Sequence, residues 1–248
     1  MRLETGCRLP QNLKEAVPLL ADSYWNRDSL PEVPRVFGHV NSDIRWGALA
    51  NAGIGAVGDC VLAEAAHGTM VWCHGAGKPF PPFTDVTIRR QYFTLTGGAD
   101  SGLDPVKVAE WRVKEGLVDA SGHRHTLKGY SRLRDLSDLA VAGYMYGGLG
   151  LMLSLPESAK YEFANAEPWA DTSGDATGGH MVFFCGRNSA QNWMCITWGR
   201  LQAMTPEWLD RYCFGVLVYY SAEYLLPTGV SPEAIRASEL EADLQRFA

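Results

Sequence analysis

The sequence predicts an α+β protein, with helices concentrated in the first half of the chain and strands in the second. The first observation is a pair of clearly marked helical segments, over residues 59–74 and 104–116. The second is a hairpin pattern over residues 180–199, where two apolar runs rich in aromatic and β-branched residues flank a short polar turn. Because the helical and strand patterns are segregated along the chain, they favour α+β over an alternating α/β arrangement.

The helices of the first half are marked mainly by their ends. Asp104 is a good N-cap, Pro105 suits the first helical position, and Gly116 suits the stop. Thr84 or Asp85 is the predicted cap of a shorter helix. In order, we predict an N-terminal arm over 1–45, a helix over 59–74, the short helix over 84–97, a helix over 104–116 and a strand pair within 117–130.

The second half alternates apolar runs with polar turns. "HMVFFCG" and "NWMCITWG" form the hairpin, and "RNSAQ" between them is its turn. "EPWADTSGDATGG" (167–179), which precedes the hairpin, reads as a polar loop. In order, we predict a helix over 135–147, a buried strand over 148–155, that loop, the hairpin, a helix and strand within 205–226, and an amphipathic helix over 231–248.

Composition and charge exclude several classes of protein. Of the 248 residues, 46 % are hydrophobic and 20 % charged, which is typical of a globular chain with a sizeable core. The formal net charge is −6 and no basic stripe is present, so nucleic acid is not expected as a partner. The apolar run 139–155 is interrupted at Gly147 and Gly148, so we expect a core helix followed by a buried strand and no membrane span.

The six cysteines are spread too thinly for a disulfide scaffold and are predicted to be free thiols. Cys185 and Cys195, which flank the hairpin turn, are the best-placed pair if a disulfide forms. No metal site is expected, because the helix that carries Cys60 would place His74 about 20 Å away. No cofactor is expected either, since the G-x-G-x-x-G string at 53–58 does not follow a predicted strand.

Cys60 is the main candidate for chemistry. It stands where the glycine-rich stretch 53–58 becomes the helix over 59–74. Unpaired N–H groups and the dipole at a helix N-terminus favour a thiolate, so Cys60 could be a nucleophile. A buried structural cysteine remains the alternative. Asp59, directly beside it, would oppose the thiolate if it were charged.

His180 is the best partner for Cys60. It opens a predicted strand directly after Gly178 and Gly179, where it can face a cleft. His67 would lie about 10 Å further along the same helix, which is too far for a base. His123 and His125 fall within a predicted exposed turn, so their side chains are expected to be solvated. A hydrogen-bonded structural role for His180 is the alternative.

Three segments in order resemble those of papain-like cysteine peptidases. "GDCV" at 58–61 resembles the family's Gly-Ser-Cys-Trp segment, residues 139–155 resemble the stretch that leads into its strand-rich lobe, and "GGHMVFFCG…NWMCITWG" resembles its histidine hairpin. The similarity is closer still to papain-fold proteins of bacteria and tailed phages, which share motifs matching Trp46 to His67 and Gly178 to Thr205.

This resemblance implies a two-lobed papain-like fold. After the arm over 1–45, a single domain over 46–248 would comprise a helical lobe to about 135, a β-rich lobe over about 136–230 and a C-terminal helix over 231–248. Cys60 would be the nucleophile, and His180 the general base and acid.

Two positions depart from the family pattern. Aligned on Trp198 and Gly199, the orienting asparagine of the family is replaced by Ile196, and a hairpin centred near residue 188 also places Ile196 opposite His180. Thr197 is then expected on the other face of the sheet. The oxyanion-hole glutamine is replaced by Ile54, so we expect Asn51 and the Cys60 N–H to form the oxyanion hole.

Two functions from different classes follow. The first is a cysteine hydrolase that cleaves a peptide or amide bond and binds a peptide-like substrate. The second is a non-catalytic papain-fold protein that binds a protein partner or assembles into a larger particle, such as a phage virion or tail tip. The N-terminus lacks the apolar run of a signal peptide, so we expect a cytoplasmic protein, or a virion component if phage-encoded.

Overall fold

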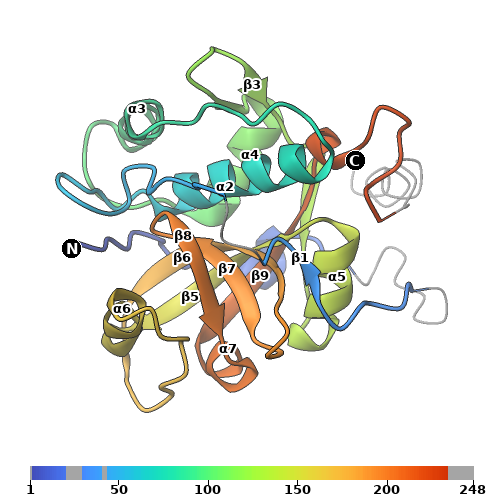
Figure 1. Ribbon diagram of the computed structural model, residues 1–248. Helices are drawn as coiled ribbons and strands as arrows, with labels where there is room; N and C mark the ends of the chain where they lie inside the picture. Colours follow the sequence, from blue (N-terminus) through green and yellow to red (C-terminus); the bar gives the residue numbers. More distant parts are fainter. Residues whose placement is uncertain (1, 21–29, 41–43, 234–248) are drawn as a thin grey trace.

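The computed structural model describes residues 2–20, 30–40 and 44–233. These residues form two lobes, with α2, α3 and α4 in the upper half of Figure 1 and a twisted sheet flanked by α5, α6 and α7 in the lower half. The elements of the helical lobe are α2 (Cys60–Gly75), α3 (Asp85–Thr96) and α4 (Pro105–Lys114), with the short strands β2 (Leu117–Val118) and β3 (Arg124–His125). The predicted α+β class is confirmed.

The second lobe is built on one antiparallel sheet. Its strands are β4 (Gly129–Arg132), β5 (Leu149–Pro156), β6 (Ala176–Arg187), β7 (Trp193–Thr197), β8 (Arg200–Met204) and β9 (Cys213–Tyr220). They follow the order β4-β9-β5-β6-β7-β8, and β1 (Phe37–Gly38) pairs with the end of β6. The remaining elements are α1 (Leu13–Ala16), η3 (Leu136–Asp138), α5 (Leu139–Met145), α6 (Glu157–Ala164), α7 (Pro206–Tyr212) and η4 (Ala222–Tyr224).

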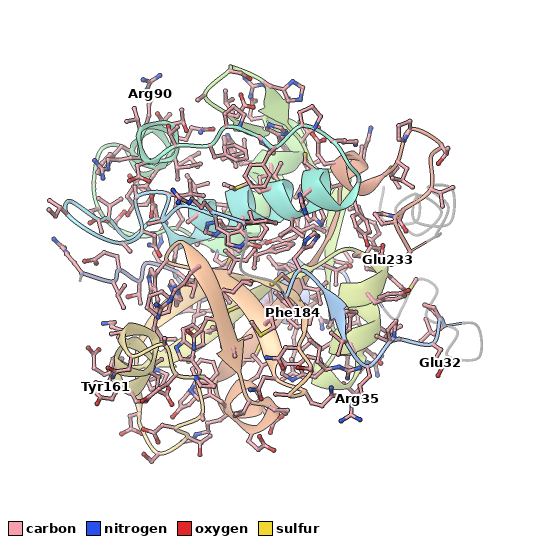
Figure 2. The ribbon with its side chains drawn as sticks, in the orientation of Figure 1. Glu32, Arg35, Arg90, Tyr161, Phe184 and Glu233 are labelled. Atoms are coloured by element: carbon pink, nitrogen blue, oxygen red, sulfur yellow. The ribbon has the colours of Figure 1, made fainter. Side chains whose placement is uncertain are left out.

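The two faces of β6 belong to two hydrophobic clusters. Met181 and Phe183 join the cluster that includes α2, whereas Val182 and Phe184 join the cluster on the opposite face of the sheet. This alternation is the two-residue period of a strand that is buried on both faces. Phe184, labelled near the middle of Figure 2, is fully buried. Gly68 lets α2 approach the sheet, because a Cβ there would lie 2.6 Å from the Phe183 ring.

Helices α3 and α4 begin as predicted. The Thr84 side chain accepts from the Thr87 N–H in a capping box, and the Asp104 carboxylate accepts from two N–H groups of the first turn of α4. The predicted helix over 135–147 is shorter, since a 3-10 turn precedes α5 and Gly147 follows it with a φ of 66°. Among the described residues, no helix is both long and apolar enough to cross a membrane.

Some boundaries differ from those predicted. The loop over 167–179 is shorter, because β6 already begins at Ala176. Its start is anchored by Trp169, which is fully buried and donates its Nε1–H to the Ala159 carbonyl. The amphipathic helix predicted over 231–248 lies almost entirely outside the described residues.

All six cysteines are free thiols, as predicted. The hairpin does not bring Cys185 and Cys195 together as a disulfide. Cys185 belongs to the cluster on the α2 face of the sheet, whereas Cys195 belongs to the cluster on the other face. The irregularity in register between Phe184 and Gly186 leaves Cys185 without a directly opposed residue on β7.

Candidate active site

Cys60 is the first residue of α2, where the sequence predicted a helix to begin. Its side chain is buried, and this burial raises the pKa of the thiol to about 12. The backbone N–H groups of Met181, Gly6 and Cys7 face the sulfur and partly offset the effect of burial on the pKa. Cys60 is therefore a neutral thiol at pH 7, and it lies against the strand that carries His180.

Asp59 does not place a charge beside this thiol at neutral pH. Its side chain is fully buried, and both carboxylate oxygens lack a hydrogen-bond donor. Burial raises the pKa of Asp59 to about 8, and the Arg89 charge lowers it only in part. The expected electrostatic opposition from Asp59 is weak at pH 7, because the carboxyl group is mainly protonated there.

His180 lies within β6 and is fully buried. Its Nε2 is 2.7 Å from Thr197 Oγ1, and its ring stacks on Trp198 with 4.5 Å between centroids. Nδ1 is buried without a hydrogen-bond partner. Burial lowers the pKa of His180 to about 3, with a smaller contribution from the Lys160 charge. The imidazole is therefore neutral at pH 7, with one nitrogen held by a hydroxyl and the other free.

The expected pairing of His180 with Ile196 is wrong. Ile196 is opposite Phe183 in the observed register, not opposite His180. The register differs because the turn is centred near residue 190 rather than 188, and because a bulge follows Phe184. Ile196 consequently faces the α2 side with Phe183, whereas Thr197 shares the opposite face with His180. The threonine that was expected to point away is the residue that contacts the imidazole.

Asn51 and Ile54 lie in the loop that leads to α2. The Asn51 side chain is buried and donates from Nδ2 to the Val57 carbonyl at 3.2 Å. Ile54 is fully exposed, so nothing at the position of the family glutamine contacts the site. In this conformation the Asn51 amide holds the loop that precedes Cys60.

The N-terminal arm crosses the site between the two lobes. The N–H groups of Gly6 and Cys7 donate to the Gly179 carbonyl, at 3.1 and 3.0 Å. On the helical side, the Leu103 N–H donates to the Gly6 carbonyl, and the Arg8 N–H donates to the Leu103 carbonyl. The backbone of the arm is therefore bonded both to the residue before His180 and to the loop before α4.

Glycines make this close passage possible. A Cβ on Gly6 would lie 1.9 Å from the Gly58 carbonyl oxygen, and a Cβ on Gly179 would lie 2.0 Å from the Cys7 carbonyl oxygen. Trp198 adds a further bond, because its Nε1–H donates to the Glu4 carbonyl at 2.9 Å. The arm thus covers Cys60 and contacts the tryptophan on which His180 stacks.

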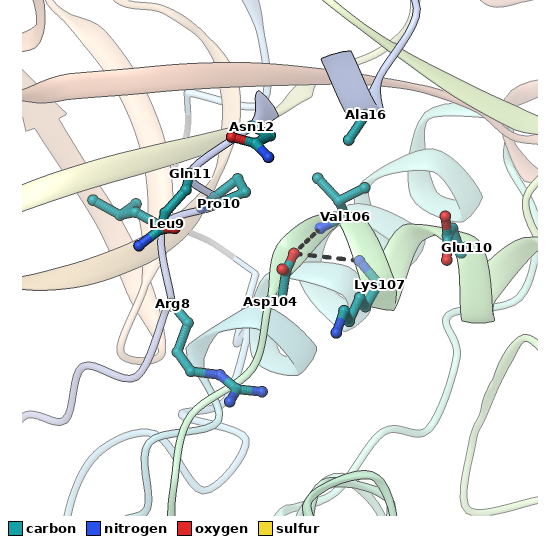
Figure 3. A pocket seen from close by; sticks show the side chains of 10 residues that line it. All are labelled: Arg8, Leu9, Pro10, Gln11, Asn12, Ala16, Asp104, Val106, Lys107 and Glu110. Carbon is teal, nitrogen blue, oxygen red and sulfur yellow. Dashed lines mark hydrogen bonds between the residues drawn. The ribbon is translucent and has the colours of Figure 1, made fainter. Parts of the chain in front are cut away.

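A groove of about 510 Å³ lies beside the arm (Figure 3). Residues 8–12 of the arm form one wall, and the start of α4 forms the other. Charged side chains of both signs line it, namely those of Arg8, Asp104, Lys107 and Glu110. Because the arm is one wall of this groove, movement of the arm would change its shape.

The other histidines are not placed to assist Cys60. His67 is buried, its Nε2–H donates to the Gly47 carbonyl oxygen at 3.0 Å, and burial lowers its pKa to about 4. His39 contacts the rings of Trp46 and His74. His125 was expected in an exposed turn, but it is buried between two carboxylates, because β2 and β3 fold back against η4.

The strand register and the covering arm were not predicted. A one-residue difference in the hairpin register exchanges the faces of Ile196 and Thr197, and bulges are not visible in an apolar sequence. Glycines such as Gly6 and Gly179 were a weak signal for the arm's passage. A glycine is needed where backbones approach this closely, but the sequence alone does not say which backbones meet.

The chain has the papain-like fold of cysteine proteases. Xylellain, a cysteine protease from Xylella fastidiosa, superposes with a TM-score of 0.64 at 13% identity, over 90% of this chain and 98% of that one. Procathepsin B S9 from Trypanosoma congolense gives 0.61 at 11% identity, over 88% and 86% of the two chains. Procathepsin L2 from the Tenebrio molitor larval midgut gives 0.56 at 15% identity, over 88% and 78%. No protein-family model and no curated protein sequence matches the chain.

Proposed function

We propose that this protein is a cysteine hydrolase that cleaves a peptide or amide bond, with Cys60 as nucleophile and His180 as general base and acid. The observation that carries the proposal is the state of the His180 ring. Its Nε2 is held by the Thr197 hydroxyl while its buried Nδ1 has no partner, and the Cys60 sulfur lies against the N–H of the next residue, Met181. A fixed imidazole with one free nitrogen, on the strand that lies against the thiol, can serve as the base in nucleophilic catalysis, although Nδ1 and the Cys60 sulfur are not hydrogen-bonded in the described conformation.

In the proposed reaction, Cys60 transfers its proton to Nδ1 of His180 and the sulfur attacks the carbonyl carbon of the substrate. His180 then gives the proton to the departing amine, which leaves a thioester on Cys60. Water, deprotonated by His180, attacks the thioester and releases the carboxylic acid, and the proton returns to the thiol. The Cys60 N–H is the proposed oxyanion donor. Asn51 would join it only after leaving the Val57 carbonyl.

The arm must move before a substrate can bind. It occupies the space over Cys60 and uses the Gly179 and Leu103 backbone groups that an extended peptide could otherwise bond. Its removal would also admit water to the thiol, which lowers the desolvation cost of a thiolate. We therefore propose that the described conformation is a latent state of the hydrolase.

The experiment compares iodoacetamide labelling of the six thiols at neutral pH in the Gly6→Ala variant. In this variant the added Cβ would clash with the Gly58 carbonyl and displace the arm from its position over Cys60. Cys60 should react at least tenfold faster than the half-buried Cys213, and His180→Ala in the same background should remove this advantage. Hydrolysis of an unfolded protein substrate should depend on Cys60 in the same variants. If His180→Ala leaves the Cys60 rate unchanged, the two residues are not a catalytic pair.

A second function is favoured by the neutral, covered state of the site. A non-catalytic papain-fold protein would have no need to uncover Cys60, and it could serve as a binding component, such as one in a phage virion or tail tip. This alternative predicts that Gly6→Ala hydrolyses nothing and that Cys60→Ala changes no binding property of the protein.

A further inference from the structure

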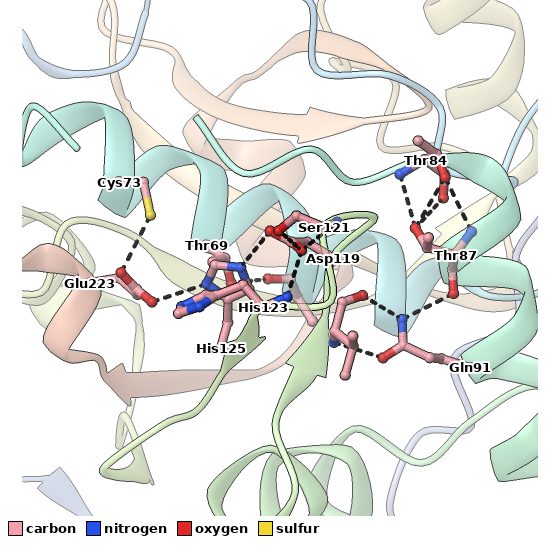
Figure 4. Close-up of polar contacts among 12 residues, drawn as sticks. Thr69, Cys73, Thr84, Thr87, Gln91, Asp119, Ser121, His123, His125 and Glu223 are labelled. Atoms are coloured by element: carbon pink, nitrogen blue, oxygen red, sulfur yellow. Dashed lines mark hydrogen bonds and ion pairs between the residues drawn. The ribbon is translucent and has the colours of Figure 1, made fainter. Parts of the chain in front are cut away.

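Cys73, His125 and Glu223 bring three metal-binding side chains together at the far end of α2 from Cys60 (Figure 4). They come from three separate parts of the chain: the end of α2, strand β3 and the turn η4. Their ligand atoms all lie within 4.8 Å of one another. Thirteen residues of helix separate Cys73 from Cys60, about 20 Å, so the cluster is distinct from the candidate active site.

The spacing of these atoms already suits one small ion. Glu223 Oε1 lies 3.0 Å from His125 Nδ1, and Glu223 Oε2 lies 3.5 Å from Cys73 Sγ. Zinc binds nitrogen and oxygen at about 2.0–2.2 Å and sulfur at about 2.3 Å, so two ligands of one tetrahedral ion are about 3.4–3.6 Å apart. Binding of one ion would then require the observed separations to adjust to this range.

His125 is oriented as a metal ligand usually is. Its Nε2 lies 3.3 Å from Asp119 Oδ2, and both side chains are buried. Asp119 is itself held, because its Oδ1 accepts from the N–H and hydroxyl of Ser121 and from the N–H of His123. A carboxylate on the outer nitrogen of a histidine fixes the ring and its tautomer, which directs the other nitrogen at the metal.

The charges of the cluster also favour a divalent cation. With Asp119 on one ring nitrogen and Glu223 on the other, both nitrogens of His125 face carboxylates. A metal ion in place of the Nδ1 proton would be neutralised by the Cys73 thiolate and the Glu223 carboxylate. Lys78, whose Nζ is 3.7 Å from Glu223 Oε2, would balance the remaining charge of Asp119.

We propose that Cys73 Sγ, His125 Nδ1 and a Glu223 carboxylate oxygen form a zinc site, with water as the fourth ligand. Thiolate, imidazole and carboxylate are the ligands that zinc takes in proteins, and the thiolate disfavours magnesium or calcium. The ion would tie the end of α2 to the β2–β3 pair and to the segment after β9. The proposed site does not depend on the proposed hydrolase activity.

The test is Co²⁺ and Zn²⁺ binding to chelator-treated full-length protein in a Cys60→Ala background, which removes the thiol of the candidate active site. One equivalent of Co²⁺ should give a thiolate-to-cobalt absorption band in the near ultraviolet and the strong visible bands of a tetrahedral site, and Zn²⁺ should displace it. Cys73→Ser should remove the near-ultraviolet band. Asp119→Asn should weaken binding by about 10–100-fold.

Matched controls are Cys213→Ser, which removes a thiol elsewhere, and His123→Ala, which removes a neighbouring imidazole that is not an assigned ligand. Both should keep the one-to-one cobalt spectrum, and circular dichroism should show that every variant is folded. Zn²⁺ should raise the unfolding temperature of the parent protein and leave that of Cys73→Ser unchanged. The proposal is overturned if the parent protein binds no Co²⁺, if Cys73→Ser keeps the thiolate band, or if His123→Ala loses it.

Discussion

His180 and Thr197 form a buried hydrogen bond of 2.7 Å between Nε2 and Oγ1, and the bond joins strand β6 to the end of β7. The hydroxyl can accept the Nε2 proton, as an amide oxygen would, and so leaves Nδ1 free. Trp198 limits rotation of the ring by stacking on it. Together these contacts fix the direction of the imidazole without an orienting asparagine, whose place in the family pattern is taken here by Ile196.

Replacing Thr197 by valine should therefore weaken both the fold and the site. The variant leaves Nε2 buried without a partner, which costs about 1–3 kcal/mol in the free energy of unfolding. In the Gly6→Ala background, Thr197→Val should also slow Cys60 alkylation at neutral pH by about tenfold or more, because the tautomer and aim of the ring are lost. Urea unfolding and mass-mapped alkylation measure the two effects.

Thr197→Ser is the matched control, because it keeps the hydroxyl and removes only a methyl group. It should retain most of the alkylation rate. Equal rates in the valine and serine variants would show that the hydroxyl does not orient His180.

Ile196→Asn should not repair the site, although the sequence pattern pointed to it. Ile196 is fully buried and packs in the cluster on the α2 face, away from the face of His180. An amide at this position meets apolar neighbours, so we expect a loss of about 1–3 kcal/mol in stability and no increase in Cys60 alkylation. An increased rate in the folded variant would contradict the observed register.

Local signals predicted the elements well, and long-range relationships poorly. The start of α2 at Cys60 and the caps Thr84 and Asp104 depend on a few neighbouring residues. Asp104 was predicted, Thr84 was one of two predicted candidates, and the start of α2 lies within one residue of the prediction. The residue that contacts His180 depends on the length of the hairpin turn and on the bulge after Phe184. A one-residue error in the register would move each later side chain of β7 to the other face of the sheet. His125 was misplaced for a related reason, since its burial depends on Glu223, which is distant in sequence.

The packing of the N-terminal arm over the site should control access to Cys60. A Cβ on Gly6 meets the Gly58 carbonyl, which is backbone and cannot move aside like a flexible side chain. Gly6→Ala should therefore displace the arm and raise the Cys60 alkylation rate at least tenfold over wild type. Hydrogen exchange should show loss of protection at the Gly6, Cys7 and Leu103 N–H groups.

Arg8→Ala serves as the control for this variant. Arg8 is exposed, and it holds the arm in place through its backbone N–H, which donates to the Leu103 carbonyl. Alanine keeps this N–H. Its labelling rate should match wild type. If Gly6→Ala labels no faster than Arg8→Ala, the arm does not limit access to the thiol.

Asp59 should make the protein less stable as the pH rises. The native carboxyl group keeps its proton until a pKa of about 8, whereas an unfolded aspartate ionises at its ordinary pKa of 3.8. The native state therefore binds more protons between these values, so the free energy of unfolding falls by about 1.4 kcal/mol per pH unit from pH 4 to pH 8 and levels off above. Asp59→Asn removes this contribution.

The measurement is urea unfolding of wild type and Asp59→Asn at several pH values from 5 to 9. The stability of the variant relative to wild type should grow steadily up to about pH 8 and then stay constant.

Glu64, whose pKa is also raised to about 8 by burial, keeps its own contribution in both proteins, so it cancels in the difference. The neutral His180 acts in the opposite direction, because its stabilisation is lost as the pH falls below 6.5, and it cancels in the same way. A difference for Asp59→Asn that does not change with pH would mean that Asp59 is ionised in the native protein, and the thiol of Cys60 would then face a charge at pH 7.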